Sequence, residues 1–144
     1  MQIDNIHCYQ KQARENLGLA LEAVKLLHDR NILFKHIHDA DNSEIPSYLN
    51  AADVLLLTSS REGSVNVVKE AMACNCPVVS TNVGDVSRVI EDTEGCFIAS
   101  FKPEDIAVKI KTALNFGRKT EGRDRIIKAG LDSNTVASRI IGLY

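Results

Sequence analysis

Two glutamates with seven residues between them, Glu62 and Glu70, stand in the stretch "SSREGSVNVVKEAMACNCPVVST" (residues 59–81). They flank a turn of small residues and the start of an apolar, helix-like segment. An ionised carboxylate accepts two hydrogen bonds, which matches the neighbouring hydroxyls of a ribose or a hexose. The pair therefore suits the two sugars of a sugar nucleotide.

The turn between the glutamates offers a place for phosphate. If Glu62 ends a buried strand, the free backbone N–H groups after it point toward one spot at the positive end of the next helix. These groups belong to Gly63, Ser64, Val65 and Asn66. A glycine at the first of these positions allows a positive φ and a close approach of the ligand to the backbone.

Two purely structural interpretations compete with ligand binding. Ser59 and Glu62 form the S-x-x-E pattern of a capping box, which needs no ligand. Gly63 follows directly, however, and would weaken the helix that this box should start. Glu70 is also compatible with a solvated helix residue beside Lys69. The residue types alone leave these alternatives open.

The elements that must position the glutamates alternate between strand-like and helix-like segments. The run "DVLLLTSS" is continuously apolar before its hydroxyls, as in a strand buried on both faces of a parallel sheet. Pro46, with Ser43 as N-cap, opens a short helix, and Pro103 opens a helix that closes on Gly117. The predicted strands are 31–38, 53–60, 76–81 and 94–100, and the predicted helices are 14–30, 42–52, 64–74, 84–92 and 102–117. Residues 121–130 and 132–144 are predicted to make one or two more helices.

This alternation predicts one α/β domain over residues 1–144, a Rossmann-like, doubly wound parallel sheet with helices on both faces and further helices at the C-terminus. Such domains usually begin with a central strand. Either "MQIDNIHCY" supplies it, through Ile3, Ile6 and Tyr9, or the first strand is missing from this chain. We favour the second interpretation, which makes the chain a fragment.

Composition excludes several classes of function. The net charge of −2 and the scattered Lys and Arg residues lack the positive field that non-specific nucleic-acid binding requires. No apolar run is long enough to span a bilayer and no signal peptide is present, so we expect a cytoplasmic protein. The cysteines, which are Cys8, Cys74, Cys76 and Cys96, lack zinc-ligand spacing and are expected to be reduced, partly buried thiols.

The histidines give no sign of a metal site. His36 and His38 would share one face of a strand, but no third ligand stands at a fixed spacing from them. We therefore expect no metal and no cofactor.

The segment "EGSVNVVKEAMACNCPVVSTNVGDVSRVI" resembles the donor-binding part of retaining glycosyltransferases of the GT-B fold, family 4, with their E-x7-E motif at Glu62 and Glu70. "NAADVLLLTS" before it and "EGCFIAS" after it resemble the family's flanking segments. The resemblance covers residues 13–143. It implies that Glu70 holds the ribose of a nucleoside-diphosphate sugar and that Glu62, as the catalytic residue, faces the transferred hexose.

The resemblance also implies that the turn residues Gly63, Ser64 and Val65 contact hexose and phosphate. Val65 stands where the family often has proline or a small residue. The Arg and Lys that neutralise the departing diphosphate in the family have no clear match: Glu15 stands where the Lys would precede Asn16. Arg14 and Lys11 are the candidates for this role after a small shift.

We therefore expect the donor-binding half of an enzyme that transfers a hexose from a UDP-, GDP- or ADP-sugar with retention of configuration. Its partners would be the donor, a glycan, lipid or other acceptor that can be membrane-associated, and a missing N-terminal acceptor domain. The chain alone should bind nucleotide and transfer nothing. A sheet without its first strand should also expose an edge, through which the chain would self-associate.

The alternative is a non-catalytic binding or regulatory module of doubly wound fold, flavodoxin-like or receiver-like. A receiver needs clustered aspartates at the strand ends. Asp39 and Asp41 end one predicted strand, but residues 58–60 are hydroxyl residues where the acceptor aspartate is expected.

Overall fold

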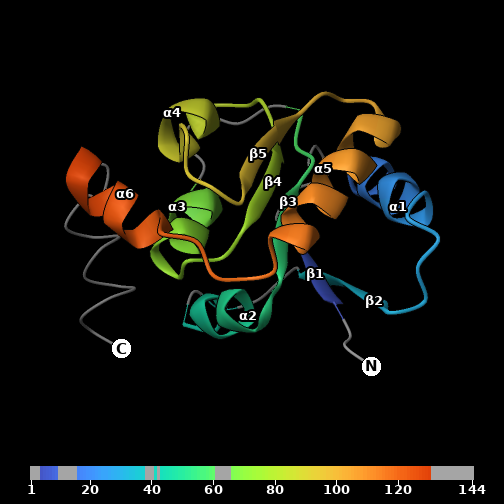
Figure 1. Ribbon diagram of the computed structural model, residues 1–144, viewed down its shortest axis with the longest axis horizontal. Helices are drawn as coiled ribbons and strands as arrows, with labels where there is room; N and C mark the ends of the chain where they lie inside the picture. Colours follow the sequence, from blue (N-terminus) through green and yellow to red (C-terminus); the bar gives the residue numbers. More distant parts are fainter. Residues whose placement is uncertain (1–3, 10–15, 38–40, 42, 61–65, 131–144) are drawn as a thin grey trace.

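The computed structural model describes residues 4–9, 16–37, 41, 43–60 and 66–130. Five parallel strands form one sheet in the order β2-β1-β3-β4-β5 (Figure 1). The strands are β1 (Asp4–Tyr9), β2 (Ile32–Ile37), β3 (Val54–Leu57), β4 (Val78–Thr81) and β5 (Cys96–Ala99). The helices are α1 (Leu17–Lys25), α2 (Ile45–Ala51), α3 (Asn66–Ala73), α4 (Val86–Ile90), α5 (Pro103–Phe116) and α6 (Gly122–Ala129). The predicted parallel α/β sheet is confirmed.

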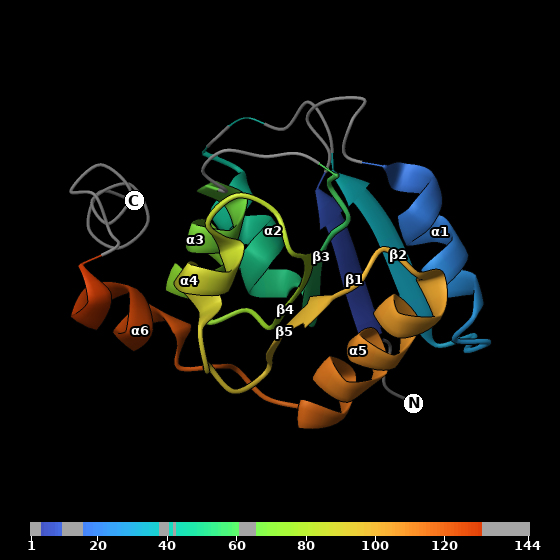
Figure 2. The same cartoon turned by 90° about the horizontal axis from the view of Figure 1, so that it is seen from above.

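The helices cover both faces of the sheet (Figure 2). One apolar core lies under α1 and α5 and includes Leu19 and Ile110. The other lies under α2, α3, α4 and α6 and includes Leu49, Met72 and Ile126. This arrangement follows from the strands, because β3 and β4 bury every side chain and so need cover on both faces.

The direction of the chain across the sheet reverses at β1. From β1 the chain moves outward to β2, and it then returns to build β3, β4 and β5 on the other side. In open α/β sheets, ligands bind outside the carboxyl ends of the strands at such a switch point. Topology therefore directs attention to the loops that follow β1 and β3.

The opening segment forms β1, which the sequence interpretation did not favour. Ile6 lies opposite Phe34 of β2 and Val54 of β3, so β1 is an interior strand. Ile6 and Cys8 are buried on one face and His7 is buried on the other. The prediction that this segment supplies no strand is therefore wrong. Pairing with strands on both sides outweighs the poor strand pattern that His7 and Asn5 create.

Helix boundaries follow the predicted signals with one exception. Pro103 opens α5 and Gly117, at φ 67°, ends it, as expected for a residue in the left-handed region. Pro46 lies in the first turn of α2, but the N-cap is Glu44 rather than Ser43, and no side chain in the described part of the chain caps this helix. The predicted helix at 121–130 is present as α6, whereas residues 132–144 lie outside the described residues.

No helix in the described part of the chain is long and apolar enough to cross a membrane.

Candidate functional site

Hydroxyl side chains join the loops at the carboxyl ends of the strands. Thr58, directly after β3, donates a hydrogen bond of 2.9 Å from Oγ1 to the carbonyl oxygen of Asn16. Thr81, the last residue of β4, donates one of 2.6 Å from Oγ1 to the carbonyl oxygen of Ser59. Thr58, Ser59 and Thr81 are all buried. These bonds hold the start of α1, the end of β3 and the end of β4 in fixed relation.

The first turn of α1 opens at this same edge. Asn16 is its N-cap and adopts a left-handed conformation with φ 53°, and its side chain accepts a hydrogen bond from the backbone N–H of Leu19 at 3.2 Å. In Figure 2, α1 begins on the side toward which the arrowheads of β1 and β2 point. The neighbouring charged residues Lys11, Arg14 and Glu15 lie outside the described residues.

Glu70 lies in the second turn of α3 and is only 7% exposed. The interpretation of Glu70 as a solvated helix residue is therefore wrong. It lies four positions after Asn66, the first residue of α3, which is about 6 Å along the helix axis. The Cα–Cβ bonds of a helix tilt toward its N-terminus, so the Glu70 side chain leaves the backbone in the direction of the loop edge of the sheet. A buried carboxylate there is costly unless polar groups satisfy it.

The remaining predicted site residues lie at the start of α3. Asn66 is the first residue of the helix and is exposed. Glu62, Gly63, Ser64 and Val65 lie outside the described residues, so their roles stay predictions. The capping-box pattern of Ser59 and Glu62 also includes residues outside the described ones, so this alternative is not tested.

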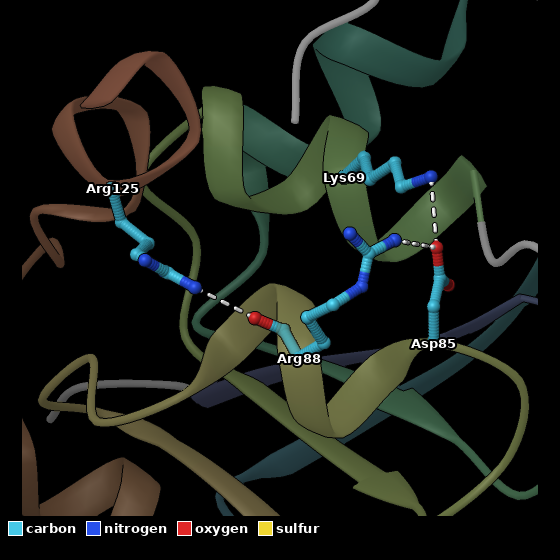
Figure 3. A network of polar contacts seen from close by, with 4 residues as sticks. All are labelled: Lys69, Asp85, Arg88 and Arg125. Atoms are coloured by element: carbon cyan, nitrogen blue, oxygen red, sulfur yellow. Dashed lines mark hydrogen bonds and ion pairs between the residues drawn. The ribbon is translucent and has the colours of Figure 1, made fainter. Parts of the chain in front are cut away.

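A cluster of charged residues that the sequence interpretation missed joins α3 to α4 (Figure 3). Lys69 Nζ lies 3.0 Å from Asp85 Oδ2, and a guanidinium nitrogen of Arg88 lies 3.5 Å from the same oxygen. The side chains of Lys69 and Asp85 are 12% and 17% exposed. Asp85 stands just before α4, in the loop that follows β4, so this ion pair lies on the same side of the sheet as the start of α3.

The C-terminal ends of α3 and α4 are both held by α6. Arg123 donates from Nε to the carbonyl oxygen of Ala73 at 2.7 Å, which satisfies the last turn of α3. Arg125 donates to the carbonyl oxygen of Arg88 at 2.8 Å, as Figure 3 shows, and pairs with Glu91 at 2.8 Å. The helix that carries Glu70 is thus fixed at its far end as well as beside Asp85.

The described thiols are unsuited to nucleophilic chemistry. All four cysteines are free and buried, rather than partly buried as expected, and their reduced state stays a prediction. Burial raises the pKa of the Cys76 thiol to about 12 and that of the Cys96 thiol to about 11. Both thiols therefore stay protonated near neutral pH and pack as small apolar groups.

The potential metal ligands of the described residues are scattered. No cluster of three or more potential ligands occurs among the described residues. The chain does contain one D-x-D pattern, Asp39 to Asp41, a type of acidic pair that holds metal ions in other proteins. Asp39 lies outside the described residues and Asp41 is exposed, so a metal-free reaction stays a prediction.

The sequence matches a known protein family. The family model described as "Glycosyl transferases group 1" matches residues 10–115. A D-inositol 3-phosphate glycosyltransferase of Paenarthrobacter aurescens is 42% identical over 65 residues, which is 44% of this chain and 16% of that protein. The capsular polysaccharide biosynthesis glycosyltransferase CapM of Staphylococcus aureus is 33% identical over 85 residues, 58% of this chain and 21% of CapM.

The fold matches solved glycosyltransferases. TarM of S. aureus, crystallised with Fondaparinux, alpha-GlcNAc-glycerol and UDP, superposes with a TM-score of 0.73 at 19% identity. The match covers 96% of this chain and 35% of TarM. The chain thus spans well under half the length of the proteins it resembles, and this likeness shows the Rossmann-like fold of GT-B enzymes.

Proposed function

Because the chain belongs to the group 1 glycosyl transferases, we propose that it is the donor-binding half of a family 4 enzyme that acts with retention of configuration. The parent enzyme transfers a hexose from a nucleoside-diphosphate sugar to a glycan, a lipid or another acceptor, which an N-terminal domain binds. The chain alone binds the nucleotide and transfers nothing, because GT-B enzymes react between two domains. Its cytoplasmic location stays a prediction.

In this proposal each part of the donor has its own residues. Glu70 accepts hydrogen bonds from the ribose hydroxyls, and Glu62 faces the hexose. The backbone N–H groups of Gly63, Ser64, Val65 and Asn66 bind hexose and phosphate. The observation that carries the proposal is the burial of Glu70 on α3, directly after a strand buried on both faces, where open α/β sheets bind ligands.

UDP is the first nucleotide to test, since the complex of the structurally similar TarM contains UDP. Calorimetric titration of the chain with UDP, GDP and ADP should show binding of one nucleotide. Glu70→Gln should weaken that binding about tenfold or more, because a hydrogen bond to a charged group contributes about 1.5–3 kcal/mol. The amide keeps the shape of the side chain, so circular dichroism should be unchanged.

Glu104→Gln is the matched control, because Glu104 is an exposed acid in the first turn of α5, on the opposite face of the sheet. Its affinity for nucleotide should equal that of the unmodified chain. Equal affinities for Glu70→Gln and Glu104→Gln would remove Glu70 from the site. A chain that binds none of the three nucleotides would contradict the proposed donor site as a whole.

A further inference from the structure

A turn around Asn75 closes the C-terminal end of α3. Asn75 has a left-handed backbone with φ 58°, and its N–H group donates to the carbonyl oxygen of Met72 at 3.0 Å. The N–H group of Cys76 donates to the carbonyl oxygen of Ala71 at 2.9 Å. These two bonds form a Schellman motif, which satisfies carbonyl oxygens in the last turn of a helix. The carbonyl oxygen of Ala73 does not take part in this motif.

Helix α6 lies beside α3 and completes this end (Figure 1). Arg123 donates from Nε to the carbonyl oxygen of Ala73 at 2.7 Å. In return, Asn75 Oδ1 accepts a hydrogen bond of 2.9 Å from the backbone N–H of Arg123, the second residue of α6. Thr120 Oγ1 accepts from the preceding N–H, that of Gly122, at 3.0 Å. The end of α3 and the start of α6 thus cap each other, and we call the two bonds between Asn75, Arg123 and Ala73 the α3–α6 interlock.

Glu70 lies within the last turn of α3, which the interlock holds. The helix has eight residues, and a helix of this length is marginal without contacts to the rest of the protein. Glu70 precedes Ala73 by three positions, so it moves with the turn to which Arg123 is bonded. Because Glu70 is only 7% exposed, its place in the packed interior depends on how firmly this turn is held.

We propose that Asn75 and Arg123 are positioning residues for the donor, because they hold the last turn of α3 so that Glu70 meets the ribose hydroxyls. This assignment rests on the proposed function. Both residues lie at the end of α3 away from the carboxyl ends of the strands, so they act through Glu70 and not on the donor itself. A binding side chain whose supporting contacts are lost sits too loosely to bind well. Loss of the interlock therefore weakens the ribose contact.

The ratio of the affinities for UDP and 2′-deoxy-UDP measures the ribose contact. The unmodified chain should bind UDP about tenfold more tightly, because the deoxy nucleotide leaves acceptor capacity of Glu70 unused. Asn75→Gly keeps the left-handed backbone and removes Oδ1, and Arg123→Met removes the guanidinium and keeps an apolar stem. Each variant should reduce the ratio about threefold, as expected for one weakened hydrogen bond. If titration selects GDP or ADP, that nucleotide and its deoxy form replace the uridine pair.

Arg125→Met is the matched control, because Arg125 lies on the same helix and donates to the carbonyl oxygen of Arg88, near the end of α4. No proposed donor residue lies on α4. Arg125→Met should lower the thermal stability as Arg123→Met does and leave the ratio unchanged. A purely structural role reduces the folded fraction, which weakens both nucleotides by the same factor. If Asn75→Gly and Arg123→Met keep the ratio of the unmodified chain, the interlock only stabilises the fold and the positioning role is overturned.

Glu70→Gln separates the failure of this inference from the failure of the proposed function. A lower ratio in Glu70→Gln and in both interlock variants, with Arg125→Met unchanged, supports the positioning role. A lower ratio in Glu70→Gln alone keeps the donor site and overturns the positioning role. Equal affinities of the unmodified chain for the two nucleotides, or binding of neither, would overturn the ribose contact of Glu70, and the positioning role falls with it.

Discussion

At the scale of single residues, the imidazole of His7 should make folding depend on pH. His7 is 4% exposed in the interior strand β1, and its Nδ1 has no hydrogen-bond partner among the described residues. Burial, together with the nearby Lys35 charge, lowers the pKa of His7 below its ordinary value of 6.5. Below that value the unfolded chain binds a proton that the folded chain resists, so stability present above pH 6.5 is lost as the pH falls.

Urea unfolding between about pH 7.5 and about pH 5 measures this effect, which amounts to at most about 1.4 kcal/mol per pH unit. His7→Leu should reduce the slope of unfolding free energy against pH, since it removes the titrating group. The control is His28→Asn, which removes an exposed histidine at φ 49° with a residue that tolerates this conformation. Equal slopes for the two variants would show that His7 does not carry the dependence.

At the scale of elements, α6 depends on a close approach to α3 that only glycine allows. A Cβ atom on Gly122 would lie 2.7 Å from the carbonyl oxygen of Met72 and 2.9 Å from its Cα. Backbone atoms cannot yield cheaply, so Gly122→Ala should destabilise the fold by about 1–3 kcal/mol in urea unfolding. Gly18→Ala on α1 is the control: its nearest contact is 3.9 Å, and it should be neutral or stabilising by up to about 1 kcal/mol. Equal stabilities would show that α6 does not need this contact.

Some helices and strands can be predicted from the sequence, and others depend on contacts that the sequence does not reveal. The strand Val54–Leu57 was predictable because an unbroken apolar run is typical of a strand that is buried on both faces. Helix α5 was predictable because a proline at its start and a glycine at its end mark both of its boundaries. β1 was not, because its polar residues make a strand only when neighbours on both sides pair with it. The pairing of Lys69 with Asp85 was equally hidden, since it depends on how two crossover helices pack. Glu70 could be singled out because its motif is local in sequence.

At the scale of the whole molecule, the edge of the sheet at β2 should lead copies of the chain to associate. Within the described sheet β2 pairs only with β1, and Leu33 on it is 54% exposed. An edge strand with unpaired backbone groups and an exposed apolar side chain is a template for another strand. Sedimentation velocity should therefore show an average mass that rises with concentration, and Leu33→Lys should suppress the rise. Val108→Lys, which replaces a 60% exposed side chain on helix α5 rather than on β2, should leave the rise intact. If the two variants behave alike, or if the unmodified chain stays monomeric at high concentration, β2 is not the surface through which copies meet.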